Sequence, residues 1–332
     1  MAELTRLVVC FTPGEGHMQR LRNEFPDIEI VECPDRTQLP DVLPGAQAVM
    51  IGSGLTSEML AAAPELRWVH SSGTGVDALL FPELIESDIV VTNNTGIQAS
   101  NMAEHLLAMM LAFARGLPDL IRAQTRSEWI QPLRASTANQ AGFREHPVFE
   151  LGYQTLAILG LGSVGRGLAQ RAEAMGMTVT GFRRHPERPV EHVDRLYGPD
   201  DWETMLGNAD HVALCLPLTQ ETRGIMNASR IASMKQGAYI YNVGRGDSID
   251  QDSLIDALQS GHLGGAGLDV TTPEPLPEDS PLWGMSNVMI TAHTSGLSPH
   301  RWDRGIELLI NNIHRFRRDE PLINVVDKRA GY

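Results

Sequence analysis

Lysine, cysteine and long hydrophobic runs are all scarce in this sequence, and each scarcity excludes a class of protein. Lysine occurs only at Lys235 and Lys328 among 332 residues, so arginine supplies nearly all of the positive charge. The formal net charge is −14. An acidic surface of this kind repels phosphates, which argues against nucleic-acid and membrane-surface partners. It still allows a locally basic pocket that binds an anionic ligand.

The three cysteines, Cys10, Cys33 and Cys215, lie in or beside apolar stretches and form no C-x-x-C pair. This pattern favours free thiols in a reducing compartment over a disulfide framework or a zinc site, so we predict no metal. The first residues lack the layout of a signal peptide, and the longest apolar helix-like run, 106–114, is too short to span a bilayer. We therefore expect a cytoplasmic protein without a membrane segment.

Short apolar strands alternate with amphipathic helices in two separate series. In the first series we expect helices such as 17–25 and 57–63 between strands at 7–11, 28–32, 48–52, 67–71 and 89–92. In the second series we expect strands at 155–159, 178–182, 211–216, 238–242, 266–270 and 287–291. The helices expected between them are 164–175, 201–206, 228–234 and 252–258. Such alternation predicts parallel sheets with helices on both faces.

The two series predict two α/β domains of the Rossmann or flavodoxin kind, with a ligand cleft between them. We expect the helix 102–115 and the irregular, polar stretch 131–147 to join the domains. A second crossing near 294–300 would return the helix 301–317 to the first domain. The predicted boundaries are therefore 1–101 with 297–332 for one domain and 102–296 for the other.

A glycine-rich turn follows the first strand of the second series. It has the pattern G-x-G-x-x-G and reads Gly160-Leu161-Gly162-Ser163-Val164-Gly165. Gly160 would permit the tight turn, Gly162 would let backbone N–H groups approach a pyrophosphate, and Gly165 would allow the helix to pack closely on the strand. We predict that the domain 102–296 binds a dinucleotide here, against the alternative of a tight turn that binds nothing.

The next strand ends in Arg183 and Arg184, where a protein that binds NAD would usually place an acidic residue. An aspartate would repel a 2′-phosphate, whereas guanidinium groups can hold it in a bidentate manner. The sequence therefore favours NADP(H), with NAD(H) possible. The alternative is that both arginines are solvated surface residues.

Three further segments carry an arginine, a glutamate and a histidine at or just beyond the predicted strand ends. These are Arg245 in the segment 242–247, Glu274 in 268–276 and His293 in 291–296. The carboxyl edge of an open parallel sheet faces the ligand crevice, so we expect the three side chains to converge near the nicotinamide. Taken singly, each has a structural alternative: a strand-end cap for Arg245, an exposed turn carboxylate for Glu274 and a satisfied structural histidine for His293.

At this point the sequence resembles the D-isomer-specific 2-hydroxyacid dehydrogenase family, which includes glyoxylate/hydroxypyruvate reductases. The resemblance runs from about residue 64 to 326 and rests on several motifs in the expected order. Besides the three segments above, these motifs are Ser72-Gly-Thr-Gly-Val-Asp77, Asn101-Met-Ala-Glu-His105, Leu216-Pro-Leu-Thr-Gln-Glu-Thr222 and Met234-Lys-Gln-Gly-Ala238.

The resemblance implies a reaction that the residues can perform. Hydride transfer to a keto carbon leaves a carbonyl oxygen that needs a proton, and His293 would supply it as a general acid. Glu274, if hydrogen-bonded to His293, would stabilise the protonated imidazole and thereby tune it. Arg245 would hold the substrate carboxylate or carbonyl. The backbone N–H groups of the first domain at Gly73, Thr74 and Gly75 would bind the other carboxylate oxygen.

By the same resemblance, Asp269 would contact the amide region of the nicotinamide, and Pro217, Thr222 and Val243 would line the cofactor cleft. The remaining expected cofactor contacts are Met102, Leu216, Gly244, Arg245 and His293, with Gly160 to Gly165. The family also implies a homodimer in contact through 102–115. Two residues depart from the family pattern near the site: Ala292 replaces a common proline and Thr271 a common aromatic residue.

We therefore predict an NADP-preferring D-2-hydroxyacid dehydrogenase that acts as a reductase of a small 2-keto acid. One alternative within the family is an enzyme that uses NAD on a bulkier 2-keto acid. An alternative of another class is a non-catalytic regulatory protein on the same fold that senses nicotinamide dinucleotides.

Overall fold

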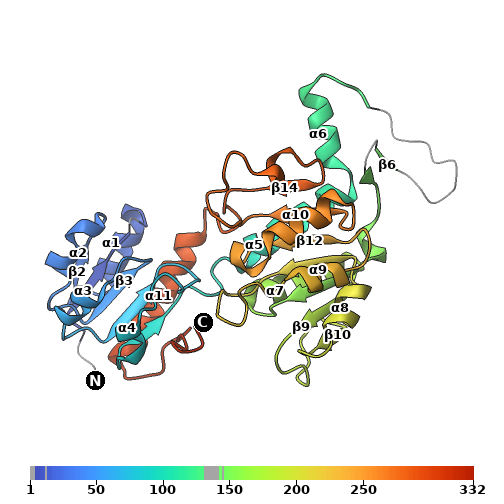
Figure 1. Cartoon of the computed structure of the whole chain (residues 1–332). Helices are drawn as coiled ribbons and strands as arrows, with labels where there is room; N and C mark the ends of the chain where they lie inside the picture. Colours follow the sequence, from blue (N-terminus) through green and yellow to red (C-terminus); the bar gives the residue numbers. More distant parts are fainter. Residues whose placement is uncertain (1–3, 12, 131–141, 144–145) are drawn as a thin grey trace. The chain divides into compact units, whose positions relative to one another are not determined.

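The computed structural model describes residues 4–11, 13–130, 142–143 and 146–332 (Figure 1). The chain divides into two compact units, one formed by Met1–Gln98 with Ser298–Tyr332 and the other by Ala99–Leu297. Each unit has its own parallel sheet with helices on both faces, which confirms the predicted fold class.

The first unit contains a five-stranded sheet in the order β2-β1-β3-β4-β5. Its strands are β1 Arg6–Val9, β2 Glu29–Glu32, β3 Ala48–Ile51, β4 Trp68–Ser71 and β5 Val90–Thr92, and all pair in parallel. Its helices are α1 Glu15–Glu24, α2 Leu39–Val42, α3 Ser57–Ala61, α4 Pro82–Glu86 and α11 Arg301–Arg317, with a 3-10 turn η1 at Arg36–Gln38.

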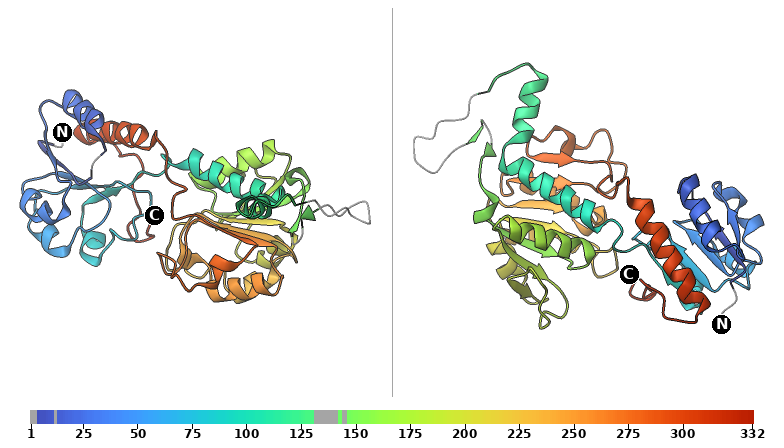
Figure 2. Two further views of the ribbon diagram at one scale, coloured as in Figure 1. Left: turned by 90° about the horizontal axis from the view of Figure 1, so that it is seen from above. Right: turned by 180° about the vertical axis from the view of Figure 1, so that it is seen from behind.

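Alternation along β1 assigns each face of this sheet its own core. Leu7 and Val9 point to the face covered by α1 and α11, which lie side by side in Figure 2, and Val8 points to the face covered by α2 and α4. Ile306 and Leu309 of α11 are fully buried against the first face. The last long helix of the chain therefore completes the unit in which the chain begins.

The second unit contains a seven-stranded parallel sheet in the order β10-β9-β8-β11-β12-β13-β14. Its strands are β8 Thr155–Leu159, β9 Thr178–Phe182, β10 Arg195–Tyr197, β11 His211–Leu214, β12 Tyr239–Asn242, β13 Gly265–Leu268 and β14 Val288–Ile290. Its α-helices are α5 Ala99–Ala114, α6 Leu117–Thr125, α7 Ser163–Ala174, α8 Trp202–Asn208, α9 Ala228–Ser233 and α10 Gln251–Gln259. Short 3-10 turns are η2 Leu151–Tyr153, η3 Gly246–Ser248 and η4 Pro281–Gly284.

The order of this sheet creates a switch point at β8. The chain runs from β8 outward through β9 and β10, then returns to β11 on the other side of β8 and runs outward to β14. Helices α5 and α7 cover one face, with Leu106 and Leu168 buried against Leu156, while α8, α9 and α10 cover the other. In such sheets ligands bind beyond the carboxyl ends of the strands, at the switch point.

The strands and helices observed lie within a few residues of the predicted ranges, and β8, β9 and α11 coincide with them. The edge strand β10 and the helices α2, α4 and α6 were not predicted. Most of the predicted irregular stretch 131–147 lies outside the described residues; within it, β6 Gly142–Phe143 pairs antiparallel with β7 His146–Pro147. All three cysteines are unpaired. Across the described ranges, no helix combines the length and the apolar character that a membrane span requires.

Candidate active site

The three glycines of the turn after β8 have different surroundings: a side chain would clash with the backbone at Gly160 and Gly165 but not at Gly162. Gly160 has a φ of 100°, and a Cβ there would lie 2.8 Å from the carbonyl oxygen of Cys215. A Cβ at Gly165 would lie 2.0 Å from the carbonyl oxygen of Gly160, so only glycine lets α7 start this close to the turn. Gly162, the N-cap of α7, has nothing within 4 Å of its missing Cβ. The open space there and the N-terminus of the twelve-residue helix fit a pyrophosphate.

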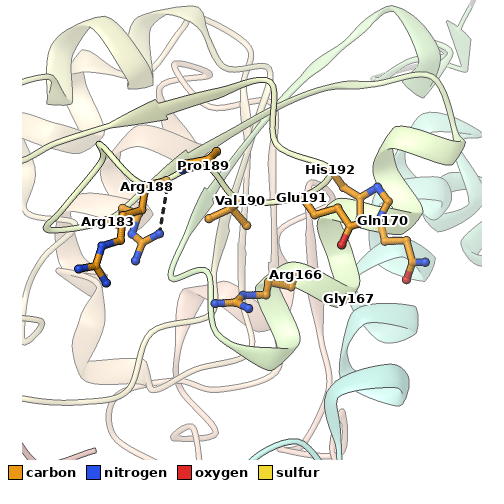
Figure 3. A pocket seen from close by; sticks show the side chains of 9 residues that line it. All are labelled: Arg166, Gly167, Gln170, Arg183, Arg188, Pro189, Val190, Glu191 and His192. Carbon is orange, nitrogen blue, oxygen red and sulfur yellow. Dashed lines mark hydrogen bonds and ion pairs between the residues drawn. The ribbon is translucent and has the colours of Figure 1, made fainter.

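A pocket of about 580 Å³ lies beside this turn (Figure 3). It is lined by Arg166, Gly167, Gln170, Arg183, Arg188, Pro189, Val190, Glu191 and His192. Figure 3 shows Arg183 and Arg188 toward one end of the pocket, Gln170, Glu191 and His192 toward the other, and Arg166 between the two groups. Arg166 Nε donates to the Leu161 carbonyl at 3.0 Å, and Arg183 Nη1 donates to the Arg188 carbonyl at 3.2 Å.

Within the described part of the chain, no ion pair joins any of these three guanidinium groups to a carboxylate. Arg184, which was predicted together with Arg183, instead has an ion pair with Glu221 at 3.0 Å. With three arginines and one carboxylate, that of Glu191, in its lining, the pocket has an excess of positive charge, although the whole chain is strongly acidic.

The loops after β11 and β12 touch at the carboxyl edge of the same sheet. A Cβ at Gly244 would lie 2.7 Å from the Leu216 carbonyl oxygen. Two of the predicted cofactor-binding segments are therefore in contact here. The Thr222 hydroxyl donates to the Pro217 carbonyl at 2.6 Å and accepts from the Thr219 N–H at 2.8 Å. Val243 is buried, and Met102, Leu161 and Val164 pack partly buried around the same core.

The loop that carries Arg245 is fastened to the loop that carries Glu274. A Cβ at Gly246 would stand 1.9 Å from the Thr271 carbonyl oxygen, so the two backbones are in direct contact. The Thr272 hydroxyl donates to Asp247 Oδ1 at 2.8 Å. Gln251 Nε2 donates to the Thr272 carbonyl at 2.6 Å, while Gln251 Oε1 accepts from the Thr272 N–H at 3.0 Å.

His293 and Glu274 form a direct pair. His293 Nδ1 lies 2.6 Å from Glu274 Oε1, and both side chains are about half exposed. The His293 backbone has a φ of 53°, in the left-handed region, and its N–H donates to the Asp269 carbonyl at 2.8 Å. His293 Nε2 forms no hydrogen bond with any described residue. One ring nitrogen is thus fixed by a carboxylate, and the other can serve a substrate.

A buried aspartate holds the backbone around His293. Asp269 accepts hydrogen bonds from the Thr291 hydroxyl at 2.6 Å, from the Thr294 N–H at 2.8 Å and from the Ser295 N–H at 3.0 Å. Burial would raise the pKa of Asp269, but the hydrogen bonds from Ser295, Thr291 and Thr294 together hold it below its usual value. An ionised Asp269 therefore fixes the chain on both sides of His293.

In the first unit, the loop after β4 has the donors expected for an anion. The N–H groups of Thr74 and Gly75 donate to no acceptor among the described residues, whereas the Gly73 N–H donates to the Ser71 hydroxyl at 3.3 Å. Asn94 Nδ2 holds the loop by donating to the Ser72 carbonyl at 2.9 Å.

The buried His70 contacts Asn94, the residue that holds this loop. His70 Nε2 lies 3.1 Å from Asn94 Oδ1 and His70 Nδ1 lies 2.7 Å from the Thr92 hydroxyl. Burial lowers the pKa of His70 to about 4, against a smaller opposite effect of the Asn94 hydrogen bond. His70 is therefore neutral near pH 7 and serves as a fixed hydrogen-bonding group in the core.

Sequence reasoning missed several residues that position the site: Asp247, Gln251 and Thr272, which join two loops, and Asn94, which fixes the loop after β4. It also missed Arg166 and Arg188 of the pocket. A possible signal for Arg188 was its position five residues beyond Arg183, in the same loop. The others show no pattern of their own, because each acts through a contact with a segment that is distant in the sequence.

A glycine-rich turn suited to a dinucleotide and a His–Glu pair at strand ends of the same sheet define an oxidoreductase that uses a nicotinamide dinucleotide. The model of the D-isomer specific 2-hydroxyacid dehydrogenase NAD binding domain matches residues 107–295. The chain belongs to this family.

Its relatives include reductases and dehydrogenases of small acids. The glyoxylate reductase of Korarchaeum cryptofilum is 32% identical over 286 residues, which cover 83% of this chain and 80% of that protein. The glycerate dehydrogenase of Methylorubrum extorquens is 28% identical over 309 residues, 92% of each chain. The NADPH-dependent glyoxylate/hydroxypyruvate reductase of Sinorhizobium meliloti, solved with NADP and sulfate, has a TM-score of 0.81 at 29% identity and covers 99% of this chain and 100% of its own.

Proposed function

We propose that this protein reduces a small 2-keto acid to the corresponding D-2-hydroxy acid and prefers NADPH as the reductant. The observation that carries the proposal is the 2.6 Å contact between His293 and Glu274, at the edge of the sheet that also carries the glycine-rich turn. The dinucleotide, when bound, supplies the hydride that adds to the keto carbon. The chain's own residues bind the acid, orient it and deliver the proton.

His293 is the proton donor in this proposal. Its Nδ1 forms a hydrogen bond with Glu274. Its Nε2 is therefore the atom that donates a proton to the keto oxygen as negative charge develops there. The carboxylate of Glu274 stabilises the imidazolium before the transfer and keeps the ring oriented after it. In the direction of oxidation, the neutral imidazole accepts the hydroxyl proton.

Arg245 and the loop after β4 are the proposed carboxylate ligands. The Arg245 guanidinium can form paired hydrogen bonds with the planar carboxylate of the substrate. The N–H groups of Thr74 and Gly75, which have no acceptor in the part of the chain that the structure describes, suit the other carboxylate oxygen, with Gly73 beside them. Binding from two sides would fix the keto carbon for attack.

The preference for NADPH rests on the three arginines of the pocket beside the turn. Arg183 lies where a ribose-binding acid would stand in an NAD-specific protein, and Arg166 and Arg188 add positive charge and form no ion pair among the described residues. The relative from Sinorhizobium meliloti is described as NADPH-dependent, which supports the same choice.

The first test is the initial rate of NADPH and NADH oxidation with glyoxylate, hydroxypyruvate, pyruvate and a branched 2-keto acid. We expect turnover of at least one acid, with kcat/KM for NADPH about tenfold or more above that for NADH, since one charge-assisted contact is worth about 1.5–3 kcal/mol. Tight dinucleotide binding without turnover of these acids or of the dicarboxylic 2-keto acids oxaloacetate and 2-oxoglutarate would reject the enzyme and favour the regulatory alternative.

Substituting the pocket arginines should change the choice of dinucleotide. We expect Arg183→Ala to weaken NADPH binding about 10- to 100-fold and NADH binding by less than about threefold, because only NADPH carries the 2′-phosphate. Arg188→Ala should show a smaller effect of the same sign. Fluorescence titration measures both affinities directly.

Arg126→Ala is the matched control for these variants, because the Arg126 guanidinium already pairs with Glu128 at 3.1 Å, away from the pocket residues. Equal losses of NADPH and NADH affinity in Arg183→Ala would contradict the proposed role of the pocket.

A further inference from the structure

Three loops meet at the carboxyl edge of the five-stranded sheet, around Gly52. They follow β2, β3 and β4 and carry Arg36, Ser53 and Ser72 respectively. From the point where a Gly52 Cβ would stand, Ser72 Oγ is 2.9 Å away and Arg36 Nη2 is 3.7 Å away. Arg36 therefore reaches from the loop after β2, across β1, to the loops after β3 and β4.

The position of the Arg36 guanidinium is held by a neutral partner. Arg36 Nη1 donates to the Ser53 hydroxyl at 2.7 Å, and Gly54 lies against its side-chain carbons. The adjacent carboxylate of Asp35 accepts from the N–H and hydroxyl of Thr37 instead. Within the described part of the chain, no carboxylate forms an ion pair with Arg36, so its charge is available to a ligand.

The neighbouring loop is the one proposed to bind the substrate. Ser72, which shares the space around Gly52 with Arg36, directly precedes Gly73, and the N–H groups of Thr74 and Gly75 have no acceptor among the described residues. A Cβ at Gly52 or Gly54 would stand 3.7 Å from an atom of Arg36, so both glycines leave the space beside this side chain unfilled. A cation and the amides proposed to bind the substrate carboxylate thus follow strands of one sheet at its carboxyl edge.

We propose that Arg36 recognises a second negative charge on the substrate, so that the preferred 2-keto acid is a dianion. The inference rests on the proposed function, since it takes the loop after β4 as the site of the substrate carboxylate. Guanidinium groups pair with carboxylates and phosphates in the same planar manner. The substrate class is a short 2-keto acid whose far end carries a carboxylate or a phosphate.

The test compares acids that differ by one charge at nearly equal size. Suitable pairs are oxaloacetate with 2-oxobutyrate and 2-oxoglutarate with 2-oxovalerate. A separate comparison of 3-phosphohydroxypyruvate with hydroxypyruvate tests a terminal phosphate, which adds bulk and up to two charges. We expect the wild-type protein to favour the dianion in at least one pair by about tenfold or more in kcat/KM, as one charge-assisted hydrogen bond allows. Arg36→Gln should remove this preference and change kcat/KM for the monoanion by less than about threefold.

Two variants separate recognition of charge from a structural role. Arg36→Lys keeps the charge and should retain part of the preference, whereas Arg22→Gln, a matched control whose arginine pairs with Glu32, should leave it unchanged. The inference is overturned if no pair shows a preference, or if Arg36→Gln lowers kcat/KM equally for both members of a pair. Absence of turnover with every 2-keto acid and both dinucleotides would overturn the proposed function as well, so the two failures are distinguishable.

Discussion

His293→Asn is expected to lower kcat for the best 2-keto acid by about 10³-fold, because general acid catalysis by a positioned side chain contributes about 10²- to 10⁴-fold. Asparagine is the appropriate replacement since the His293 backbone has a φ of 53°, which asparagine adopts more readily than most residues. The amide cannot exchange a proton with the keto oxygen. Single-turnover kinetics with bound NADPH measure the chemical step itself.

Dinucleotide affinity is the control for this variant, and we expect it to change by less than about threefold, because the glycine-rich turn and the arginine pocket are intact. Glu274→Gln should cause an intermediate loss, about 10- to 100-fold, since glutamine can orient the ring but has no charge to stabilise an imidazolium. If His293→Asn retains more than a tenth of the wild-type kcat, His293 is not the proton donor and the proposed mechanism fails.

The sequence predicted those parts of the fold and the site that depend on local order. Strand β8 is almost wholly apolar and β9 follows it after one helix, so a short window contains the whole β–α–β unit and its glycine pattern. Arg245, Glu274 and His293 could be placed at strand ends for the same reason. The edge strand β10 was missed because its three residues include a single buried one, Tyr197, and show no alternation.

Contacts between distant segments could not be predicted in this way. The side-chain amide of Gln251, at the start of α10, forms hydrogen bonds with the backbone of Thr272, 21 residues further along the chain, and no local pattern marks that pair. Arg183 and Arg184 are neighbours with the same chemistry, yet one lines a pocket and the other pairs with Glu221. Which arginine faces a ligand depends on the loop conformation and on a partner from the segment after β11. The predicted homodimer likewise depends on surfaces, and it stays a prediction.

Substitution of two glycines of the same turn should separate folding from dinucleotide binding. At Gly165 we expect alanine to destabilise the protein by about 3 kcal/mol or more, because overpacking of a closed site typically costs 1–3 kcal/mol and here the Cβ meets backbone. That Cβ would lie 2.0 Å from the Gly160 carbonyl oxygen, so either α7 or the turn must move. Urea unfolding monitored by circular dichroism measures the change.

At Gly162 the expected result is the opposite combination. Its φ of −75° and ψ of −160° suit alanine, and nothing lies within 4 Å of the added methyl group, so the free energy of unfolding should change by less than about 1 kcal/mol. The methyl group would occupy the space through which a pyrophosphate approaches the backbone N–H groups, and NADPH affinity should fall about 100-fold. Unchanged NADPH affinity in a folded Gly162→Ala protein would mean that this turn only connects β8 to α7. The dinucleotide site, and the catalytic assignments made around it, would then have to lie elsewhere in the chain.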